Sequence, residues 1–328
     1  MDYRDAGVDL DGADAHVERI APRVTATWHD DVVGGFGGFA AGIRLPEGYR
    51  SPVLMMCTDG VGTKLELARR TGRWEGVGFD LVAMSVDDLV VAGAKPIGFV
   101  DYMAVGALDP ARDEAIVASI AEACSVAGCP LLGGETAEHP GVMEPDAVDL
   151  AGAAMGVVEE DERLGPERTR EGDVVIGLRS PNLRSNGFSL VRRVFESADL
   201  DARFPEEDAS IAEVLLRPSV IYTPAVLEAV ATGGVHAAAH VTGGGLMANL
   251  TRSVAPHLEA VIDHWSWEWP NVFTQIQRLA GISVEEMRRT FNLRSGFCLI
   301  VDPEHANAVI AAASQHDPQV IGTLRARD

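Results

Sequence analysis

One stretch, residues 52–65, constrains the fold of this chain more than any other. An apolar run at 52–56 predicts a short buried strand, and it leads into Thr58-Asp59-Gly60-Val61-Gly62-Thr63-Lys64. Gly60 and Gly62 lack a Cβ, so the backbone can turn sharply and approach a ligand closely. Free amides beside a lysine ammonium suit phosphate oxygens, and a carboxylate in the same turn suits Mg²⁺. The stretch therefore predicts a strand followed by a phosphate-binding turn.

An alternative for this stretch is a glycine-rich hairpin that merely exposes an aspartate and a lysine. The turn is not a Walker A motif, because Thr63 precedes Lys64 instead of following it. The chain has only two lysines, Lys64 and Lys95, among 27 basic residues. A lysine kept in this turn by so lysine-poor a chain favours the phosphate-binding interpretation.

Length, charge and cysteine content bound the class of protein. A chain of 328 residues should divide into about two domains. The net charge of −22 argues against a general nucleic-acid or membrane surface, which needs a basic field. The four cysteines lack zinc-pair spacing, and the N-terminus lacks the apolar region of a signal peptide. We therefore expect a cytoplasmic protein with reduced thiols and with no nucleic-acid or membrane partner.

Several carboxylates are expected at or near the ends of elements in the first half. Asp87 and Asp88 lie in a buried helix predicted within 78–94 and ending near Gly93, where adjacent charges are costly unless they are paired or bind metal. An exposed pair is the alternative. Asp101 lies near the end of a strand-like segment at 96–105, and Glu135 follows a predicted strand at 130–132. Together with Asp59 and Lys64, these groups predict magnesium–nucleotide binding at one edge of a sheet.

The second half offers a separate anion site. A charged segment at 159–173 marks the predicted boundary between domains 1–165 and 166–328. The polar loop Arg184-Ser185-Asn186 follows a strand, and the turn Thr242-Gly243-Gly244-Gly245 precedes a helix, where free amides favour an anion. A plain helix-entry turn is the alternative. A nucleotide site and a phosphate-bearing substrate site together predict an ATP-driven enzyme with its cleft between domains. The three tryptophans at 265–269 are expected to form a packing corner.

The ordered set of motifs resembles a known family over nearly the whole chain. The segments that carry the resemblance are Asp5-Ala6-Gly7-Val8-Asp9, Gly35-Phe36-Gly37-Gly38, Thr58 to Leu65, Asp80 to Met84 with Asp88-Leu89-Val90, Gly133 to Glu138, Ser185-Asn186-Gly187, His240 to Gly245 and Arg289-Thr290-Phe291-Asn292. They look like phosphoribosylformylglycinamidine cyclo-ligase, the aminoimidazole ribonucleotide (AIR) synthetase of purine biosynthesis.

The resemblance implies an α/β (α+β) fold of two AIR-synthetase-like domains. The N-terminal domain would bind ATP and form a homodimer through sheets that pair as a barrel-like interface. The C-terminal domain would hold a phosphoribosyl-type substrate on a sheet flanked by helices. The implied reaction is the ATP-dependent closure of the imidazole ring of formylglycinamidine ribonucleotide, which gives AIR, ADP and phosphate.

The resemblance also implies residue roles, with ATP and Mg²⁺ as the cofactors. The metal ligands would be Asp59, Asp88 and Glu135, and the catalytic residues Lys64, Asp88 and Asn186. The nucleotide would be bound by Gly35, Phe36, Gly37, Gly38, Thr58, Asp59, Gly60, Gly62, Thr63, Lys64, Asp87, Asp101 and Glu135. The composition of segment 35–38 is typical of either a mobile flap over a ligand or a close-packed turn. The resemblance implies that it is a flap over ATP. The substrate would be bound by Arg184, Ser185, Asn186, Thr242, Gly243, Gly244, Gly245, Asn292 and Arg294.

Two departures fall in the half expected to bind substrate. Arg184 stands where the family usually has histidine, and Arg294 stands where it has glycine. An arginine in place of glycine cannot be neutral if the backbone there has positive φ or lies near substrate. These departures suggest a paralogue that acts on a different amide or amidine as one alternative. A catalytically silent nucleotide-binding subunit is another, although the retained Asp59, Lys64, Asp88 and Glu135 argue against it.

Overall fold

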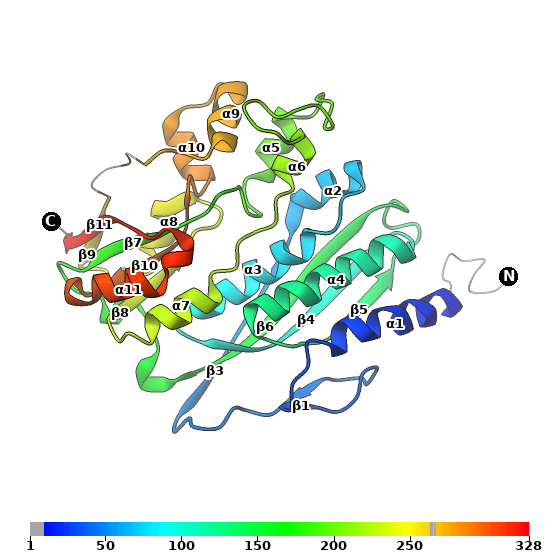
Figure 1. Ribbon diagram of the computed structural model, residues 1–328, viewed down its shortest axis with the longest axis horizontal. Helices are drawn as coiled ribbons and strands as arrows, with labels where there is room; N and C mark the ends of the chain where they lie inside the picture. Colours follow the sequence, from blue (N-terminus) through cyan, green and yellow to red (C-terminus); the bar gives the residue numbers. More distant parts are fainter. Residues whose placement is uncertain (1–9, 263–264, 266, 328) are drawn as a thin grey trace.

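The structure, a computed structural model, describes residues 10–262, 265 and 267–327. Two sheets lie side by side, and helices cover both (Figure 1). This arrangement is the two-domain α/β fold that the sequence predicted. The exact division at 165/166 stays a prediction. Among the described helices, none has the length and apolar character needed to cross a membrane.

The N-terminal sheet has the strand order β3-β6-β4-β5. Only the β4–β5 pair is parallel, and the other neighbours are antiparallel. The strands are β3 (Pro52–Gly60), β4 (Lys95–Val105), β5 (Leu131–Glu138) and β6 (Val148–Glu159). A small hairpin, β1 (Val32–Val33) with β2 (Gly42–Ile43), precedes them.

Helices cover one face of this sheet (Figure 1). They are α1 (Leu10–Thr25), α3 (Val77–Val90) and α4 (Pro110–Ala127), and the short η1 (Gly62–Lys64) and α2 (Leu65–Thr71) follow β3. Helix α4 begins where the Asp109 side chain accepts hydrogen bonds from two backbone amides, and it ends at Gly128 with φ 74°. The apolar sides of α3 and α4 pack on Phe99, Met103 and Leu131 to form the N-terminal core.

The opposite face of the N-terminal sheet carries exposed apolar side chains. Leu54 and Met56 of β3 are 54% and 73% exposed, and Val100 and Tyr102 of β4 are 38% and 42% exposed. Strand β6 runs between them, with Met56 opposite Met155 and Tyr102 opposite Ala151. Because side chains alternate along a strand, these residues share one face.

The C-terminal sheet is antiparallel, with the order β8-β10-β7-β11-β9. Its strands are β7 (Val174–Arg179), β8 (Val235–His240), β9 (Leu258–Val261), β10 (Ser295–Val301) and β11 (Gln319–Ala326). Every residue of β10 is buried. Phe297, Leu299 and Val301 pack on one side, against α7 (Thr223–Val230) and α11 (Ala306–Ala312). Cys298 and Ile300 pack on the other side, near α8 (Gly245–Thr251).

A second helical group lies beyond the end of this sheet (Figure 1). It contains α5 (Phe188–Val194), α6 (Ile211–Leu215), α9 (Asn271–Ala280) and α10 (Val284–Thr290), which pack around Phe273 and Phe291. Single 3-10 turns occur at Glu160–Glu162, Pro166–Arg168, Pro303–His305 and Ser314–His316.

The structure corrects two element boundaries that matter for the site. Strand β3 continues to Gly60, so Thr58 and Asp59 lie within a strand instead of in the predicted turn. Glu135 likewise lies inside β5, which extends from 131 to 138. A Cβ at Gly60 would lie 2.9 Å from the carbonyl oxygen of Leu150. Gly60 is therefore required by the close approach of β6.

Candidate active site at the junction of the two domains

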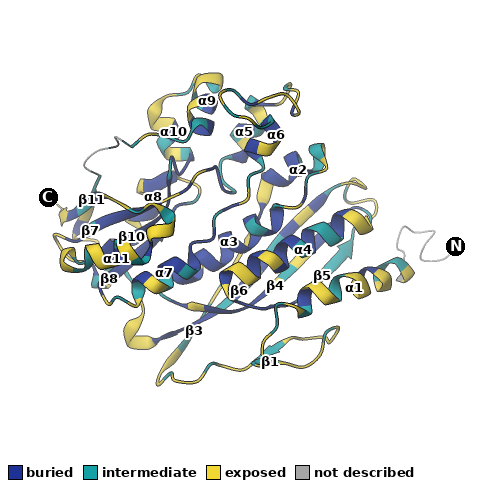
Figure 2. Ribbon diagram, viewed as in Figure 1, coloured by how far each residue is buried: buried dark blue, intermediate teal, exposed yellow. Residues whose placement is uncertain are grey.

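Helix α3 is the element on which the two domains meet. Figure 2 shows it buried along almost its whole length. Asp80, Met84 and Asp87 follow one another at intervals of three or four residues, so they share one face of the helix. This face meets residues of the C-terminal half, through Ser219, Asn186 and Arg184 respectively. The sequence missed this role of Asp80, because no pattern along the chain identifies its partners.

Lys64 forms a buried ion pair at this junction. Its Nζ lies 2.7 Å from Oδ2 of Asp80 and donates to the carbonyl oxygens of Arg184 and Arg217 at 3.0 and 2.9 Å. Burial lowers the pKa of Lys64 and raises the pKa of Asp80, and the attraction between the two charges opposes both shifts.

The predicted contact between Lys64 and phosphate does not fit this geometry. The side chain is 1% exposed, and three protein oxygens use the three donors of the ammonium. Lys64 therefore ties the start of α2 to α3 and to the second half of the chain.

Arg184 and Asp87 form a second buried ion pair. Nη2 of Arg184 lies 2.6 Å from Oδ2 of Asp87, and neither side chain is exposed. The other oxygen of Asp87 accepts hydrogen bonds from the backbone N–H groups of Tyr222 and Thr223. The predicted contacts of Asp87 with nucleotide and of Arg184 with substrate do not fit, because protein groups enclose both charges.

Arg294 is also occupied within the protein. Its guanidinium pairs with Asp317 at 2.5 Å, and its backbone has φ 100°. From the sequence, an arginine in place of glycine was expected to matter if the backbone has positive φ, and the backbone of Arg294 does. Because Arg184 and Arg294 both pair with aspartates of the same chain, they do not support the hypothesis of an altered substrate.

Asp88 and Asp59 are the exposed carboxylates of the site. Asp88 lies at the exposed edge of α3 with a side chain that is 44% exposed, and its Oδ1 accepts a hydrogen bond from His240. Both carboxylates lie close to Cys57, whose thiol donates to the carbonyl oxygen of Ser85. Burial raises the pKa of Cys57 to about 12, and the charges of Asp88 and Asp59 add to this increase. Carboxylates of this kind are the hard oxygen donors that suit Mg²⁺.

Asp101 and Glu135 lie on opposite faces of the N-terminal sheet. Asp101 aligns with Gly152 and, through it, with Asp59, so both aspartates point to the helix-covered face. Glu135 pairs in register with Tyr102, whose side chain is on the other face. Accordingly, in the part of the chain that the structure describes, no three His, Cys, Asp or Glu side chains come together as a metal site. The predicted convergence of Asp59, Asp88 and Glu135 is therefore not found within one copy of the chain.

The segment 35–38 lies between β1 and β2 with its glycines exposed. A Cβ on Gly35 or Gly37 would have no atom within 4 Å. The interpretation as a close-packed turn is therefore wrong, whereas the flap interpretation stays a prediction. Phe36 is half-buried and packs against the N-terminal core.

Two residues that were predicted to bind substrate, Ser185 and Asn186, lie against the turn after β3 and against α3. Oγ of Ser185 donates to the carbonyl oxygen of Val61, and Oγ1 of Thr63 lies 3.4 Å from Oγ of Ser189. Nδ2 of Asn186 lies 3.6 Å from Sδ of Met84. A Cβ on Gly243 would lie 3.8 Å from Oδ1 of Asn186, so the amide is beside the glycine turn.

Asn249, which the sequence did not single out, holds the glycine turn in place. Its Nδ2 donates to the carbonyl oxygens of Thr242, Gly243 and Gly245. A Cβ on Gly245 would lie 1.9 Å from the carbonyl oxygen of Arg288, so only glycine fits there. The signal in the sequence was an asparagine one turn after the glycines, which ordinary helices also contain. Asn292 is buried and donates to the carbonyl oxygen of Asn182, so it supports the polar loop from behind.

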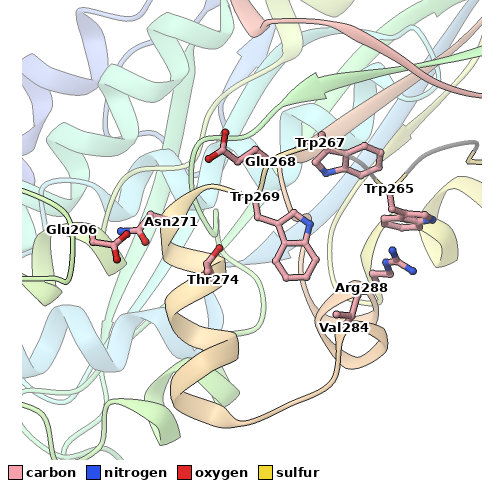
Figure 3. A pocket seen from close by; sticks show the side chains of 9 residues that line it. All are labelled: Glu206, Trp265, Trp267, Glu268, Trp269, Asn271, Thr274, Val284 and Arg288. Carbon is pink, nitrogen blue, oxygen red and sulfur yellow. The ribbon is translucent and has the colours of Figure 1, made fainter.

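The tryptophan cluster forms the packing corner that the sequence predicted. Trp265 and Trp267 stack at 5.3 Å between ring centroids, and Nε1 of Trp267 donates to the carbonyl oxygen of Leu293. The cluster borders a hollow of about 470 Å³ against α9 and α10, where Arg288 lies over Trp265 (Figure 3). None of the predicted site residues lines this hollow.

Comparisons with known proteins agree with this architecture. The model of the AIR synthase related protein N-terminal domain matches residues 39–158, and that of the C-terminal domain matches residues 170–328. The chain is therefore an AIR synthase related protein of two domains. It is 44% identical, over 329 aligned positions, to the phosphoribosylformylglycinamidine cyclo-ligase of Synechococcus sp. (strain CC9605), and the match covers 99% of this chain and 95% of that protein. The chain belongs to the phosphoribosylformylglycinamidine cyclo-ligase family.

Solved structures share the fold at low sequence identity. A thiamine-monophosphate kinase from Stenotrophomonas maltophilia has a TM-score of 0.67 at 21% identity, and covers 96% of this chain and 94% of its own. The hydrogenase maturation protein HypE in complex with ATP has a TM-score of 0.62 at 18% identity, and covers 95% of this chain and 84% of its own.

Proposed function

We propose that the chain catalyses the ATP-dependent ring closure of formylglycinamidine ribonucleotide to AIR, a step of purine biosynthesis in the cytoplasm. The observation that carries this proposal is the full-length 44% identity to a cyclo-ligase. The positions of Asp88 and Asn186 support it. Met84 contacts Asn186 and lies four residues before Asp88 on α3. Residues four apart share a helix face, so the exposed carboxylate of Asp88 lies next to the polar loop that contains Asn186.

The chemistry proceeds by activation of an amide oxygen. The γ-phosphoryl group of ATP passes to the formamide oxygen of the substrate, which converts a poor leaving group into phosphate and releases ADP. The amidine nitrogen then attacks the same carbon, phosphate leaves with that oxygen, and loss of a proton gives the imidazole ring. The role of the protein is to align the two reactants and to stabilise the charge on phosphate.

Residues around α3 have distinct parts in this proposal. Asp59 and Asp88 would hold Mg²⁺, which when bound neutralises phosphate charge. The amide of Asn186 would orient the substrate, and the turn from Thr242 to Gly245 would bind its 5′-phosphate. The ATP complex of HypE, which has the same fold, supports a nucleotide site in such a protein. The exposed segment 35–38 would close over the nucleotide.

We also propose a homodimer that forms through the exposed face of the N-terminal sheet. Leu54, Met56, Val100 and Tyr102 make this face apolar, although the net charge of the chain is −22. Contiguous apolar surface of this kind marks an interaction site. Glu135 points to this face, so pairing of two sheets would bring it to the interface.

A turnover assay tests the function. Purified protein with Mg-ATP and formylglycinamidine ribonucleotide is expected to form ADP and AIR in equal amounts. ADP formation without AIR would instead favour a different amide substrate. If neither product forms while nucleotide binds, the enzyme assignment is overturned.

A further inference from the structure

His240 joins a buried arginine to an exposed carboxylate. It ends β8, and its side chain is 2% exposed. Nη1 of Arg184 lies 2.6 Å from Nε2 of this ring, and Nδ1 lies 2.7 Å from Oδ1 of Asp88. Along the chain, His240 stood out only as the first residue of the motif at 240–245. A connected path of hydrogen bonds thus runs from the core between the domains to the edge of the site.

These two contacts fix the position of the ring proton. An arginine N–H group can only donate a hydrogen bond, so Nε2 of His240 must accept. The proton of the ring is therefore on Nδ1, from which it is donated to Asp88. Without the arginine contact, either nitrogen could carry the proton, and the ring could present a lone pair to the carboxylate.

The guanidinium of Arg184 is itself held on several sides. It pairs with Asp87 at 2.6 Å and donates to the carbonyl oxygens of Val220 and Gly296 at 3.0 and 3.3 Å. Cζ of Arg184, the central carbon of the guanidinium, lies 4.9 Å from the ring centroid of Tyr222. The backbone at Arg184 has φ 58°, a left-handed conformation that directs the side chain into this enclosure. Such a rigid donor can select one orientation of its neighbour.

We propose that Arg184 and His240 are positioning residues for Asp88. Arg184 fixes the tautomer and the orientation of His240, and the Nδ1–H group of His240 holds one oxygen of Asp88, which leaves the other for the cation of the nucleotide complex. This inference rests on the proposed function, in which Asp88 is a metal ligand. In this proposal Arg184 positions His240 and does not bind a different substrate.

The first test needs no ligand. Side-chain ¹⁵N chemical shifts of His240, assigned by comparison with His240→Asn, are expected to show a single tautomer with the proton on Nδ1. Arg184→Lys retains a positive charge for Asp87, but a single ammonium replaces the two guanidinium nitrogens that contact Asp87 and His240. Without a fixed donor to Nε2 of His240, the variant is expected to give a mixture of tautomers. A wild-type proton on Nε2, or an unchanged single tautomer in Arg184→Lys, would overturn the proposal.

The second test uses a matched pair of variants at position 240. The amide of asparagine superimposes on Nδ1–H and can still donate to Asp88, whereas glutamine reaches toward Arg184 and loses that donor. Calorimetry with Mg-ADP is expected to show affinity within about threefold of wild type for His240→Asn and a loss of about tenfold for His240→Gln, as for other groups that orient metal ligands. Equal losses in the two variants would indicate a merely structural role and overturn the proposal.

A control separates this inference from the proposed metal site. ADP in the presence of EDTA should bind the two variants equally well, and both should melt as folded proteins. Asp88→Asn should lose the Mg²⁺-dependent part of the affinity. If Asp88→Asn binds Mg-ADP like wild type, the metal role of Asp88 is wrong and positioning it has no purpose. The tautomer measurement would still report whether the hydrogen-bonded path exists.

Discussion

Asp101 shows how one side chain can make stability depend on pH. Its carboxyl lies against the backbone of β5, where a Cβ on Gly134 would be 2.2 Å from Oδ1. Burial raises the pKa of Asp101 to about 7, and a hydrogen bond from its own backbone N–H opposes the shift. The folded state therefore binds a proton more tightly at this position than the unfolded state does.

The raised pKa gives a prediction for Asp101→Asn. The contribution of the aspartate to stability is fully present below about pH 4, near its unfolded pKa, and is lost as the pH rises through about 7. The variant should thus gain stability over wild type at pH 8 by at most about 4 kcal/mol, at 1.36 kcal/mol per pKa unit, and the gain should fall as the pH is lowered. Urea unfolding at several pH values measures this difference. The exposed Asp149→Asn should show no such trend, and a constant difference for Asp101→Asn would contradict the raised pKa.

Individual charges illustrate what the sequence could and could not predict. It marked Lys64, Asp87 and Arg184 as special, and the structure gives each of them a defined task. It could not show that their partners lie within the protein, because Asp80 is 16 residues from Lys64 and Asp87 is 97 residues from Arg184. A charge that binds phosphate and a charge that pairs in the core look the same along the chain. By contrast, Asp59 and Asp88, which were predicted to share a metal site, are both exposed, and their charges both raise the pKa of Cys57.

At the scale of elements, α3 supplies the carboxylates of two buried ion pairs at the junction of the two halves of the chain. Asp80 and Asp87 are seven residues apart, which is two helical turns, so both face the same neighbours. Asp80 receives Lys64 and the hydroxyl of Ser219, and Asp87 receives Arg184. Removing one partner of such a pair leaves an uncompensated buried charge, which is more costly than removing both.

Lys64→Met should therefore lower the free energy of unfolding by about 3–5 kcal/mol, since Asp80 would lose its cation. The double variant Lys64→Met/Asp80→Leu should recover much of this loss. Lys95→Met serves as the control, because Lys95 is exposed and should change stability by less than about 0.5 kcal/mol. Urea unfolding measures all three. A single variant as stable as the control would show that the buried pair is not needed for stability.

Elements with a clear hydrophobic period were predictable, and those without one were not. Long apolar runs mark strands β4, β6 and β10, and a one-sided apolar pattern marks helix α4, so the sequence alone locates these elements. Strand β8 was missed, since two histidines interrupt its alanines, and β9 and β11 were missed as well. The extension of β3 through Asp59 and Gly60 was also missed. Pairing with β6 stabilises it there, and no local residue preference shows this.

At the scale of the whole molecule, the uncovered face of the N-terminal sheet predicts association. The wild-type chain has a mass of 34.9 kDa and is expected to elute as a dimer of about twice that mass. Met56→Glu places a charge in the middle of the apolar face, where Met56 is 73% exposed, and should give a monomer that remains folded. Light scattering after size-exclusion chromatography measures the mass. Leu279→Glu, on exposed α9, should leave the dimer intact. A wild-type monomer would contradict the proposed pairing.

The burial of Lys64 also means that chemical labelling of this residue can report separation of the two halves of the chain. Of its two side-chain amines, Lys95 is exposed and should react with an acylating reagent at once. Lys64 is covered by both halves of the molecule and should react only in those molecules in which the halves have separated. The labelling rate of Lys64, measured by mass spectrometry with Lys95 as the internal reference, would therefore report how fast the two domains separate, without any engineered label.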